Sequence, residues 1–163
     1  MSPAEQLSDL AARLDGVEIL PGVALAAPKF DASWSEADRS LDGLQLPATF
    51  IDFLLRVGAI SAMDTAGGIA FLTPDEVRDH LHQAHGHLIR SVDGTPAFPF
   101  AVNGSGSYLL LALDDSSVWK YNAHMHPVAK PIRIADGFDS FLGRLVADWE
   151  AVLAGRGGPY ATS

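Results

Sequence analysis

Apolar residues recur every three or four positions in the first third of the chain and again near its end, which is the spacing of an amphipathic helix. Ser2-Pro3-Ala4-Glu5 has the form of a capping box with proline at the first helical position. Ser33 can cap a second helix, and Leu46-Pro47 opens a third. The sequence predicts that these helices end at Gly16, Gly43 and Gly58.

After Gly58, the segments with regular hydrophobic spacing become shorter. Residues 67–72 form a strand candidate, and Thr73-Pro74-Asp75-Glu76 repeats the capping box, which predicts a helix running towards Leu88. From Pro96 onward, short β-like runs separated by turn-forming residues replace the helical spacing. We expect strands at residues 97–102, 108–113, 118–121 and 128–134. Pro131 places the last of them at a sheet edge or a bulge.

The final helical stripe follows Asp136, which can cap the helix, and runs from Phe138 to Leu153. These patterns predict one α+β domain, in which N-terminal helices and a long C-terminal helix pack on an antiparallel, mostly meander sheet. The core should include Phe50, Phe53, Leu54, Phe141, Leu145 and Trp149. We divide the chain into a lead-in (1–30), the domain (31–153) and a frayed tail (154–163).

The composition is that of a folded domain, and it excludes several kinds of catalytic and metal-binding site. The chain has 163 residues, 48% of them hydrophobic and 19% charged, which allows a core without disulfides. It contains no cysteine, so thiol nucleophiles, thiolate metal sites and disulfides are excluded. No run approaches the ~20 apolar residues of a membrane span, and we expect a cytoplasmic protein.

The charge balance is acidic. Twenty acidic and eleven basic residues give a formal net charge of −9. A chain of this kind is poorly suited to binding phosphate backbones or anionic lipid, and its field attracts a basic partner. Solubility alone also explains such a charge.

Six histidines are the most conspicuous candidate ligands, because neutral imidazole binds zinc and copper. His80, His82, His85 and His87 fall in the predicted helix. If that helix persists to Leu88, His82 and His85 lie on one flank of its apolar face and the other two on the opposite flank. The four therefore cannot converge on one ion, and we expect neither a metal nor another cofactor.

Two polar motifs have turn composition. Gly104-Ser105-Gly106-Ser107 stands between two strands, whereas a nucleophile elbow stands between a strand and a helix, so we interpret it as a turn. We also interpret Asp114-Asp115 as turn residues whose side chains accept hydrogen bonds from the local backbone. The alternative is that these carboxylates form an exposed acidic rim beside Trp119 and Tyr121, which would be a binding feature. These aromatics share one face of their strand, where such pairs are more often core than contact surface.

In their order, these segments resemble the SUKH superfamily (Smi/Knr-type domain) from about Trp34 to Leu153. The resemblance rests on Leu46-Pro47 before an apolar helix, on Leu72-Thr73-Pro74-Asp75-Glu76-Val77, on Phe100-Ala101-Val102-Asn103-Gly104-Ser105-Gly106 and on Ile134-Ala135-Asp136-Gly137-Phe138. Arg56-Val57-Gly58-Ala59 departs from it, since the family commonly has an asparagine–glycine pair there. The first 30 residues are not explained by the family pattern.

The resemblance implies a non-enzymatic domain, commonly an immunity protein that blocks a nuclease or deaminase toxin of a polymorphic toxin system. It transfers no catalytic residues. We therefore expect a basic toxin domain as the partner, with a regulatory interaction module as the alternative and a histidine-dependent metallohydrolase as a third possibility. The expected partner-binding residues lie at the hairpin end and in the following loop, namely Asp114, Asp115, Tyr121, His124 and His126.

Overall fold

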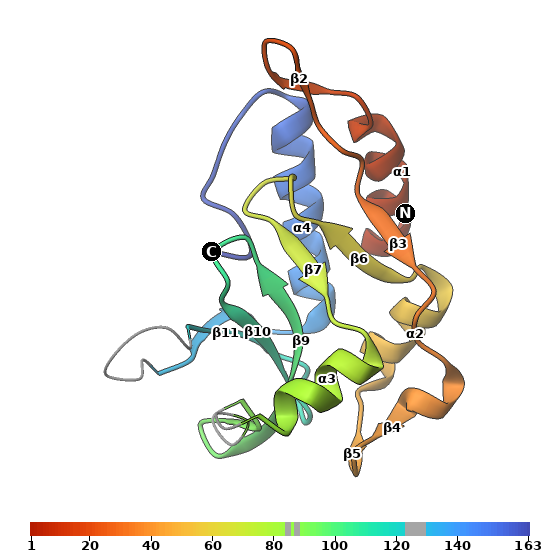
Figure 1. Ribbon diagram of the computed structural model, residues 1–163, viewed down its shortest axis with the longest axis vertical. Coiled ribbons are helices and arrows are strands. Elements are labelled where there is room, and N and C mark those ends of the chain that lie inside the picture. Colours follow the sequence, from red (N-terminus) through yellow and green to blue (C-terminus); the bar gives the residue numbers. More distant parts are fainter. Residues whose placement is uncertain (84–85, 87–88, 123–129) are drawn as a thin grey trace.

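The protein has a large antiparallel sheet with helices on both faces (Figure 1). The structure, a computed structural model, describes residues 1–83, 86, 89–122 and 130–163. The helices of the described residues are α1 (Pro3–Leu14), α2 (Ala48–Arg56), α3 (Pro74–Leu81) and α4 (Phe138–Leu153), and η1 (Glu36–Arg39) is a 3-10 turn. The single-domain α+β prediction, with its long C-terminal helix, is confirmed.

The main sheet has the order β12-β11-β10-β9-β7-β6-β3, with β8 paired to the start of β9. Its strands are β3 (Lys29–Asp31), β6 (Ala59–Ala62), β7 (Ile69–Phe71), β8 (Ser91–Val92), β9 (Thr95–Asn103), β10 (Tyr108–Ala112), β11 (Val118–Tyr121) and β12 (Ile132–Ala135). Every pair is antiparallel, and β9 to β12 form the expected meander. Pro99, which cannot donate to a ladder, lies beside a register shift between β9 and β10.

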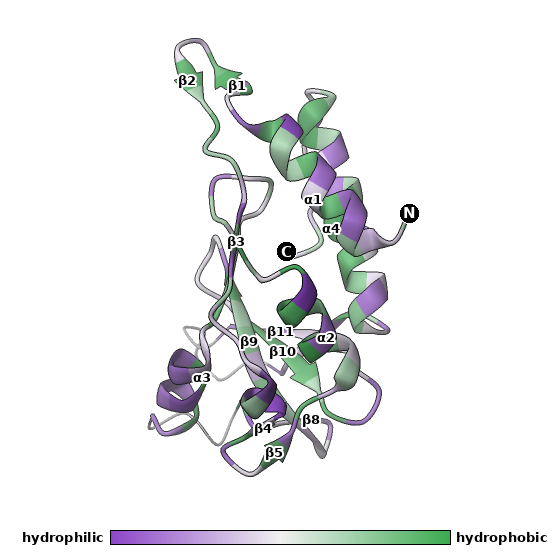
Figure 2. Ribbon diagram, turned by 90° about the vertical axis from the view of Figure 1, so that its right-hand side faces the viewer, coloured by the Kyte–Doolittle hydropathy of each residue, from purple (hydrophilic) through white to green (hydrophobic). Residues whose placement is uncertain are grey.

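The helices divide between the two faces of the sheet. α1 packs along α4, and both lie on the face opposite α3 (Figure 2). The spacing of the apolar residues explains this packing, because Leu7, Leu10 and Leu14 of α1 lie on its buried face. The six predicted core residues are all buried, with at most 2% of their surface exposed.

An aromatic cluster occupies the centre of the core. Phe50 of α2 is fully buried, and its ring meets those of Phe98, Phe100 and Phe138 edge to face, at centroid distances of 5.3, 5.7 and 5.4 Å. Trp34 packs on Phe50 at 5.5 Å and donates its indole N–H to a backbone carbonyl. The cluster therefore joins α2, the sheet and α4.

The prediction of a helix that ends at Gly43 is wrong. In its place, η1 leads into a two-stranded hairpin, β4 (Ser40–Leu41) and β5 (Leu44–Gln45). The Asp42-Gly43 pair forms its loop, with φ of 52° and 79°. Asp-Gly supplies the two positive φ angles of a type I′ turn, and this local preference overrides the helical spacing of Trp34 and Leu41.

Other boundaries also differ from the prediction. The strand expected at residues 128–134 is β12, which begins at Ile132 and ends at Ala135, and residues 128–129 lie outside the described ranges. α3 ends at Leu81 rather than near Leu88, and Gly86 then lies so close to the Leu81 carbonyl that a Cβ atom would not fit there. α4 begins at Phe138 with Gly137, not Asp136, as its N-cap. Asp136 is exposed and pairs with Arg133.

The first and last segments of the chain also contact the domain. A second hairpin, β1 (Glu18–Leu20) with β2 (Val23–Ala24), follows α1 and projects from the body (Figure 2). The tail predicted to be frayed instead folds back, and Ala161 and Thr162 are 7% and 2% exposed. The boundaries at residues 30 and 153 stay a prediction.

Truncating Leu145 tests the buried face of α4. Leu145 is 2% exposed, so Leu145→Ala should lower the free energy of unfolding by about 2–5 kcal/mol in urea titrations. The matched control is Leu55→Ala, because Leu55 lies on α2 with 37% of its surface exposed and should cost much less. Equal losses from the two variants would contradict this packing.

Candidate functional site

The β8–β9 and β10–β11 turns lie side by side at one end of the sheet and border a depression of about 190 Å³. We call it the Asp114 depression. Its polar and aromatic lining consists of Asp93, Thr95, Asp114, Asp115, Ser117, Trp119 and Arg133. Three carboxylates and one cation therefore line it, among the residues that the structure describes.

Both carboxylates of the β10–β11 turn organise its backbone. Asp114 Oδ1 accepts the Asp115 N–H at 2.7 Å, and Asp115 Oδ1 accepts the Ser117 N–H at 2.9 Å. Hydrogen bonds from the Ser117 hydroxyl and N–H, together with nearby Arg133, hold the pKa of Asp115 below its usual value. The interpretation of this motif as turn chemistry is confirmed, and both side chains remain exposed.

Arg133 connects the turn to an aromatic ring. Its guanidinium lies 3.6 Å from the Asp115 carboxylate and 5.8 Å from the centroid of the Trp119 ring. The Trp119 indole N–H donates to the Ser117 hydroxyl at 2.8 Å, which fixes the ring at the border of the depression. A flat, partly buried aromatic surface therefore lies beside exposed carboxylates.

The structure brings only part of the predicted binding set together. Asp114 and Asp115 lie in the depression, and their contact with a partner stays a prediction. Tyr121 is 2% exposed and lies opposite Tyr108 of β10, so its side chain is not available to a partner, contrary to expectation. His124 and His126 lie outside the described residues.

His80 and His82 contact different side chains of the same chain. The His80 ring contacts the Tyr108 hydroxyl at 2.7 Å, whereas His82 lies 3.3 Å from the Asp42 carboxylate. His85 and His87 lie outside the described residues. Within the described ranges, no group of three or more His, Cys, Asp or Glu side chains is placed to hold a metal ion.

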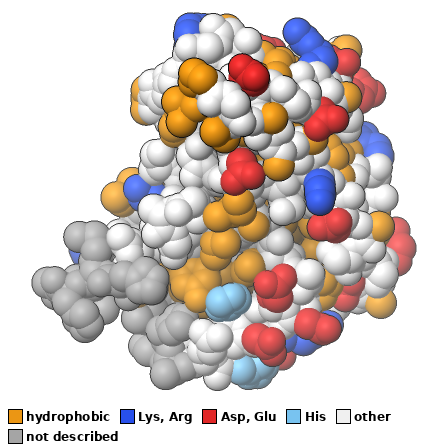
Figure 3. Space-filling view, turned by 45° about the horizontal axis from the view of Figure 1, so that its top comes forward, with side chains coloured by type: hydrophobic (Ala, Val, Ile, Leu, Met, Phe, Trp, Pro, Cys, Tyr) orange, Lys and Arg blue, Asp and Glu red, His pale blue; other side chains and the backbone are white. Residues whose placement is uncertain are grey.

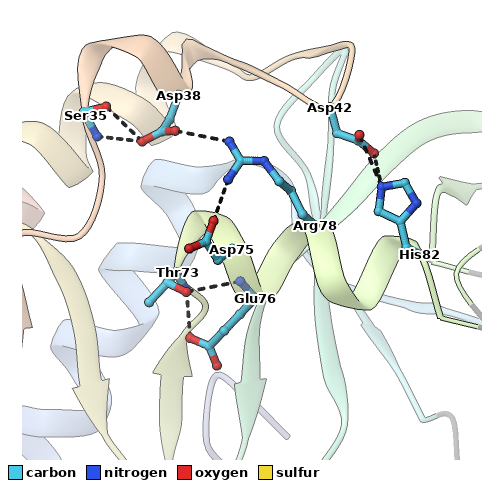
Figure 4. A network of polar contacts seen from close by, with 8 residues as sticks. All are labelled: Ser35, Asp38, Asp42, Thr73, Asp75, Glu76, Arg78 and His82. Atoms are coloured by element: carbon cyan, nitrogen blue, oxygen red, sulfur yellow. Dashed lines mark hydrogen bonds and ion pairs between the residues drawn. The ribbon is translucent and has the colours of Figure 1, made fainter.

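A polar network on the α3 side of the molecule was missed by sequence reasoning (Figure 4). Arg78 of α3 lies 2.8 Å from Asp75 and 3.7 Å from Asp38 of η1. His82 and Arg90 both contact Asp42 in the β4–β5 loop. The Thr73 capping box was visible in the sequence, but pairs some 40 residues apart carry no local signal.

The Gly104-Ser105 turn is confirmed as structural. Asn103 Oδ1 accepts hydrogen bonds from the Ser105 hydroxyl at 2.9 Å and from the Ser107 N–H at 2.9 Å. Ser105 therefore takes part in organising its own turn.

The protein is a small α+β domain with helices on both faces of an antiparallel sheet. Its described surface includes an acidic depression bordered by an aromatic ring, which is a suitable place for binding another macromolecule. The chain belongs to the SMI1/KNR4 family (SUKH-1), whose family model matches residues 31–144. Domains of this family are in general non-catalytic immunity or regulatory domains that act through protein–protein interaction. A comparison with curated proteins finds no match.

The described part of the chain contains no helix with the length and apolar character needed to cross a bilayer.

The lowered pKa of Asp115 predicts an acid-dependent contribution to stability. Because the pKa is lower in the folded state than the ~3.9 of an unfolded chain, the contribution is present above that pH and is lost as pH falls through the folded-state pKa. An NMR titration of the Asp115 carboxyl carbon should give a midpoint below about 3.9, and Ser117→Ala should raise it. An unshifted midpoint would contradict this geometry.

Metal content is a separate prediction. Because His80 and His82 contact different partners, we expect the purified protein to retain no zinc after dialysis, as measured by elemental analysis. Stoichiometric zinc that is lost on changing His82 and His85 to Ala would reverse this expectation.

Proposed function

We propose that this protein is an immunity protein that binds and neutralises a toxin of a polymorphic toxin system, of the nuclease or deaminase type. Membership of the SMI1/KNR4 family supports an immunity or regulatory role. The observation that carries the choice of partner is the Asp114 depression, where three carboxylates face one cation among the described residues. A basic protein surface complements this arrangement.

The charge of the whole chain supports the same partner. The net charge is −9, and acidic side chains are spread over the face seen in Figure 3 rather than gathered in one patch. Such a field accelerates the approach of a basic protein, and local contacts then determine its orientation. The encounter would take place in the cytoplasm, where a nuclease or deaminase meets its substrate.

The bound state follows from the chemistry of the depression. A toxin that acts on nucleic acid presents cations to phosphate groups, and Asp93, Asp114 and Asp115 would occupy those phosphate positions. The Trp119 ring supplies the apolar contact, because a partly buried aromatic side chain adds contact area with little loss of conformational freedom. The inhibited toxin would be blocked sterically, with no covalent step.

A regulatory interaction module without a toxin partner remains the alternative, because the family includes both roles. A toxin gene with a variable C-terminal domain beside the gene for this protein favours immunity. Co-purification of this protein with the product of that gene is the direct test.

Removing two charges from the depression should slow association with the basic partner. Asp114→Asn combined with Asp115→Asn keeps the oxygens that accept the turn hydrogen bonds and loses only the charge interaction of Asp115 with Arg133, so the thermal midpoint should fall only slightly. At low salt, stopped-flow association should slow by about threefold to tenfold, and the difference should shrink as salt rises and the Debye length falls from about 10 Å at 0.1 M to 3 Å at 1 M.

The matched control combines Asp9→Asn with Asp64→Asn, which removes the same charge from α1 and from the β6–β7 turn, away from the depression. This variant should slow association less. Equal slowing by the two variants would remove the depression from the interface, and association that does not depend on salt would remove the charge argument.

A further inference from the structure

The β1–β2 hairpin presents an apolar tip to the solvent. Ile19, Leu20 and Val23 are 47%, 65% and 47% exposed. Pro21-Gly22 forms the turn between the two strands, and the Gly22 φ of 77° is the positive value of a type II turn. Exposed apolar side chains are ordinary when they are scattered singly, but three at one projecting tip indicate a contact surface (Figure 2).

The base of the hairpin holds this tip in place. The Gly16 N–H donates to the Leu25 carbonyl, and the Leu25 N–H donates to the Val17 carbonyl at 2.7 Å. Leu25 is 3% exposed and belongs to the core. An isolated two-stranded ribbon is marginally stable in water, so this one depends on its buried base and gains stability from a surface that covers its tip.

A recess of about 340 Å³ lies beside β1, and charged side chains of both signs line it. Glu18 and Asp64 provide carboxylates, and Arg156 provides a guanidinium. Ile19 of the tip is part of the same lining. Among the residues that the structure describes, none of these three charged groups has an ion-pair partner. Apolar side chains beside a polar, charged rim are the usual arrangement of a protein–protein interface.

The distribution of charge favours a second copy of this chain as the occupant. Residues 16–28 carry one charged side chain, Glu18, in a chain of net charge −9. Two such acidic molecules repel each other least where their hairpins meet. A two-fold contact places a surface against itself, so a rim with both carboxylates and an arginine is self-complementary, which a uniformly acidic rim is not. The same net charge repels an anionic lipid surface.

The contact uses side-chain packing rather than the addition of a strand. The register between β1 and β2 shifts between Glu18 and Leu20, and such an irregularity disfavours the pairing of a further strand along the edge of the ribbon. The apolar side chains of the tip remain available to pack on their copies. The hairpin precedes residue 31, where the match to the family begins, so the family pattern does not account for this surface.

We propose that two copies of this chain associate about a two-fold axis through the tips of their β1–β2 hairpins. The three exposed apolar side chains form the centre of the contact, and Arg156 of each copy faces the Glu18 and Asp64 carboxylates of the other. The contact is small, so the dimer is weak and forms as the concentration rises. The Asp114 depression lies at the far end of the molecule, near β8, and stays accessible in the dimer (Figure 2).

Sedimentation velocity of the full chain, from about 5 μM to about 500 μM, tests the dimer. The sedimentation coefficient of the unmodified chain should rise with concentration. Ile19→Ser combined with Leu20→Ser should weaken dimerisation at least about tenfold, because it removes most of the apolar centre. The matched control combines Leu55→Ser with Ile132→Ser, which changes two apolar residues of other surfaces, 37% and 58% exposed, and should leave the dimer unchanged.

Arg156→Glu tests the charged rim. It should weaken dimerisation about threefold to tenfold, because each recess then presents only carboxylates to the other copy. Lys130→Glu is the matched control, since it changes the net charge by the same amount at an exposed position that precedes β12. Equal weakening by the two variants would remove the rim from the contact.

The effect of salt distinguishes this contact from the proposed toxin contact. Each copy carries a charge of −9, so screening lowers the overall repulsion more than it weakens the rim contacts. Dimerisation should therefore strengthen between about 0.05 M and about 0.5 M salt, whereas association with a basic partner should weaken. The two proposals can thus fail separately.

A chain that stays monomeric at about 500 μM would overturn the proposal, and so would a dimer that survives Ile19→Ser with Leu20→Ser. If that double variant does not fold, Leu20→Gln alone replaces it, because Leu20 is the most exposed of the three side chains. A monomeric chain that co-sediments with phosphatidylcholine vesicles, and no longer does so in the hairpin variant, would assign the tip to a lipid surface and also reject the proposal.

Discussion

The edge-to-face packing around Phe50 is the contact on which the rest of the structure depends. Its ring joins α2 to Phe98 in the sheet and to Phe138 at the start of α4. Aromatic pairs of this geometry contribute about 0.5–1.5 kcal/mol each beyond the area they bury. Because the three elements share one side chain, α2, which begins at Ala48, and α4, which follows Gly137, are positioned together. The turns at both ends of the sheet therefore project from a fixed frame.

Much of this frame is predictable because hydrophobic spacing reports directly on burial. The α4 stripe and the change to β-like runs after Pro96 both survive in the structure. The helix before Gly43 fails because Asp42-Gly43 has a stronger local preference, for a two-residue turn, than the spacing of Trp34 and Leu41 has for a helix. Where a turn signal and a periodicity compete over a short segment, the turn decides the outcome here.

The candidate sites were less predictable, since they depend on contacts between distant residues. Asp114 and Asp115 could be placed in a turn from composition alone, but the position of Arg133 beside them depends on the pairing of β11 with β12. The alternation of side chains along β11 identifies the face on which Tyr121 lies, but it does not show what covers that face. In the structure Tyr121 is buried. The hydrogen bond from the Asn103 amide to the Thr162 carbonyl also joins two residues that no local pattern connects.

The distribution of ion pairs explains why an acidic chain can keep one end free for a partner. Asp38 of η1 pairs with Arg78 of α3, and Asp42 of the β4–β5 loop pairs with Arg90 and contacts His82 directly after α3, so these two carboxylates connect η1 and the hairpin to the region around that helix. In the Asp114 depression, the described residues give Asp93 and Asp114 no ion-pair partner, while Arg133 is shared between Asp115 and Asp136. Ion pairs within the chain therefore neutralise acidic side chains around α3. Between the β8–β9 and β10–β11 turns, the described residues leave the charges of Asp93 and Asp114 without such pairs. An incoming cation at that place would gain attraction without first breaking an ion pair of Asp93 or Asp114, which favours fast association.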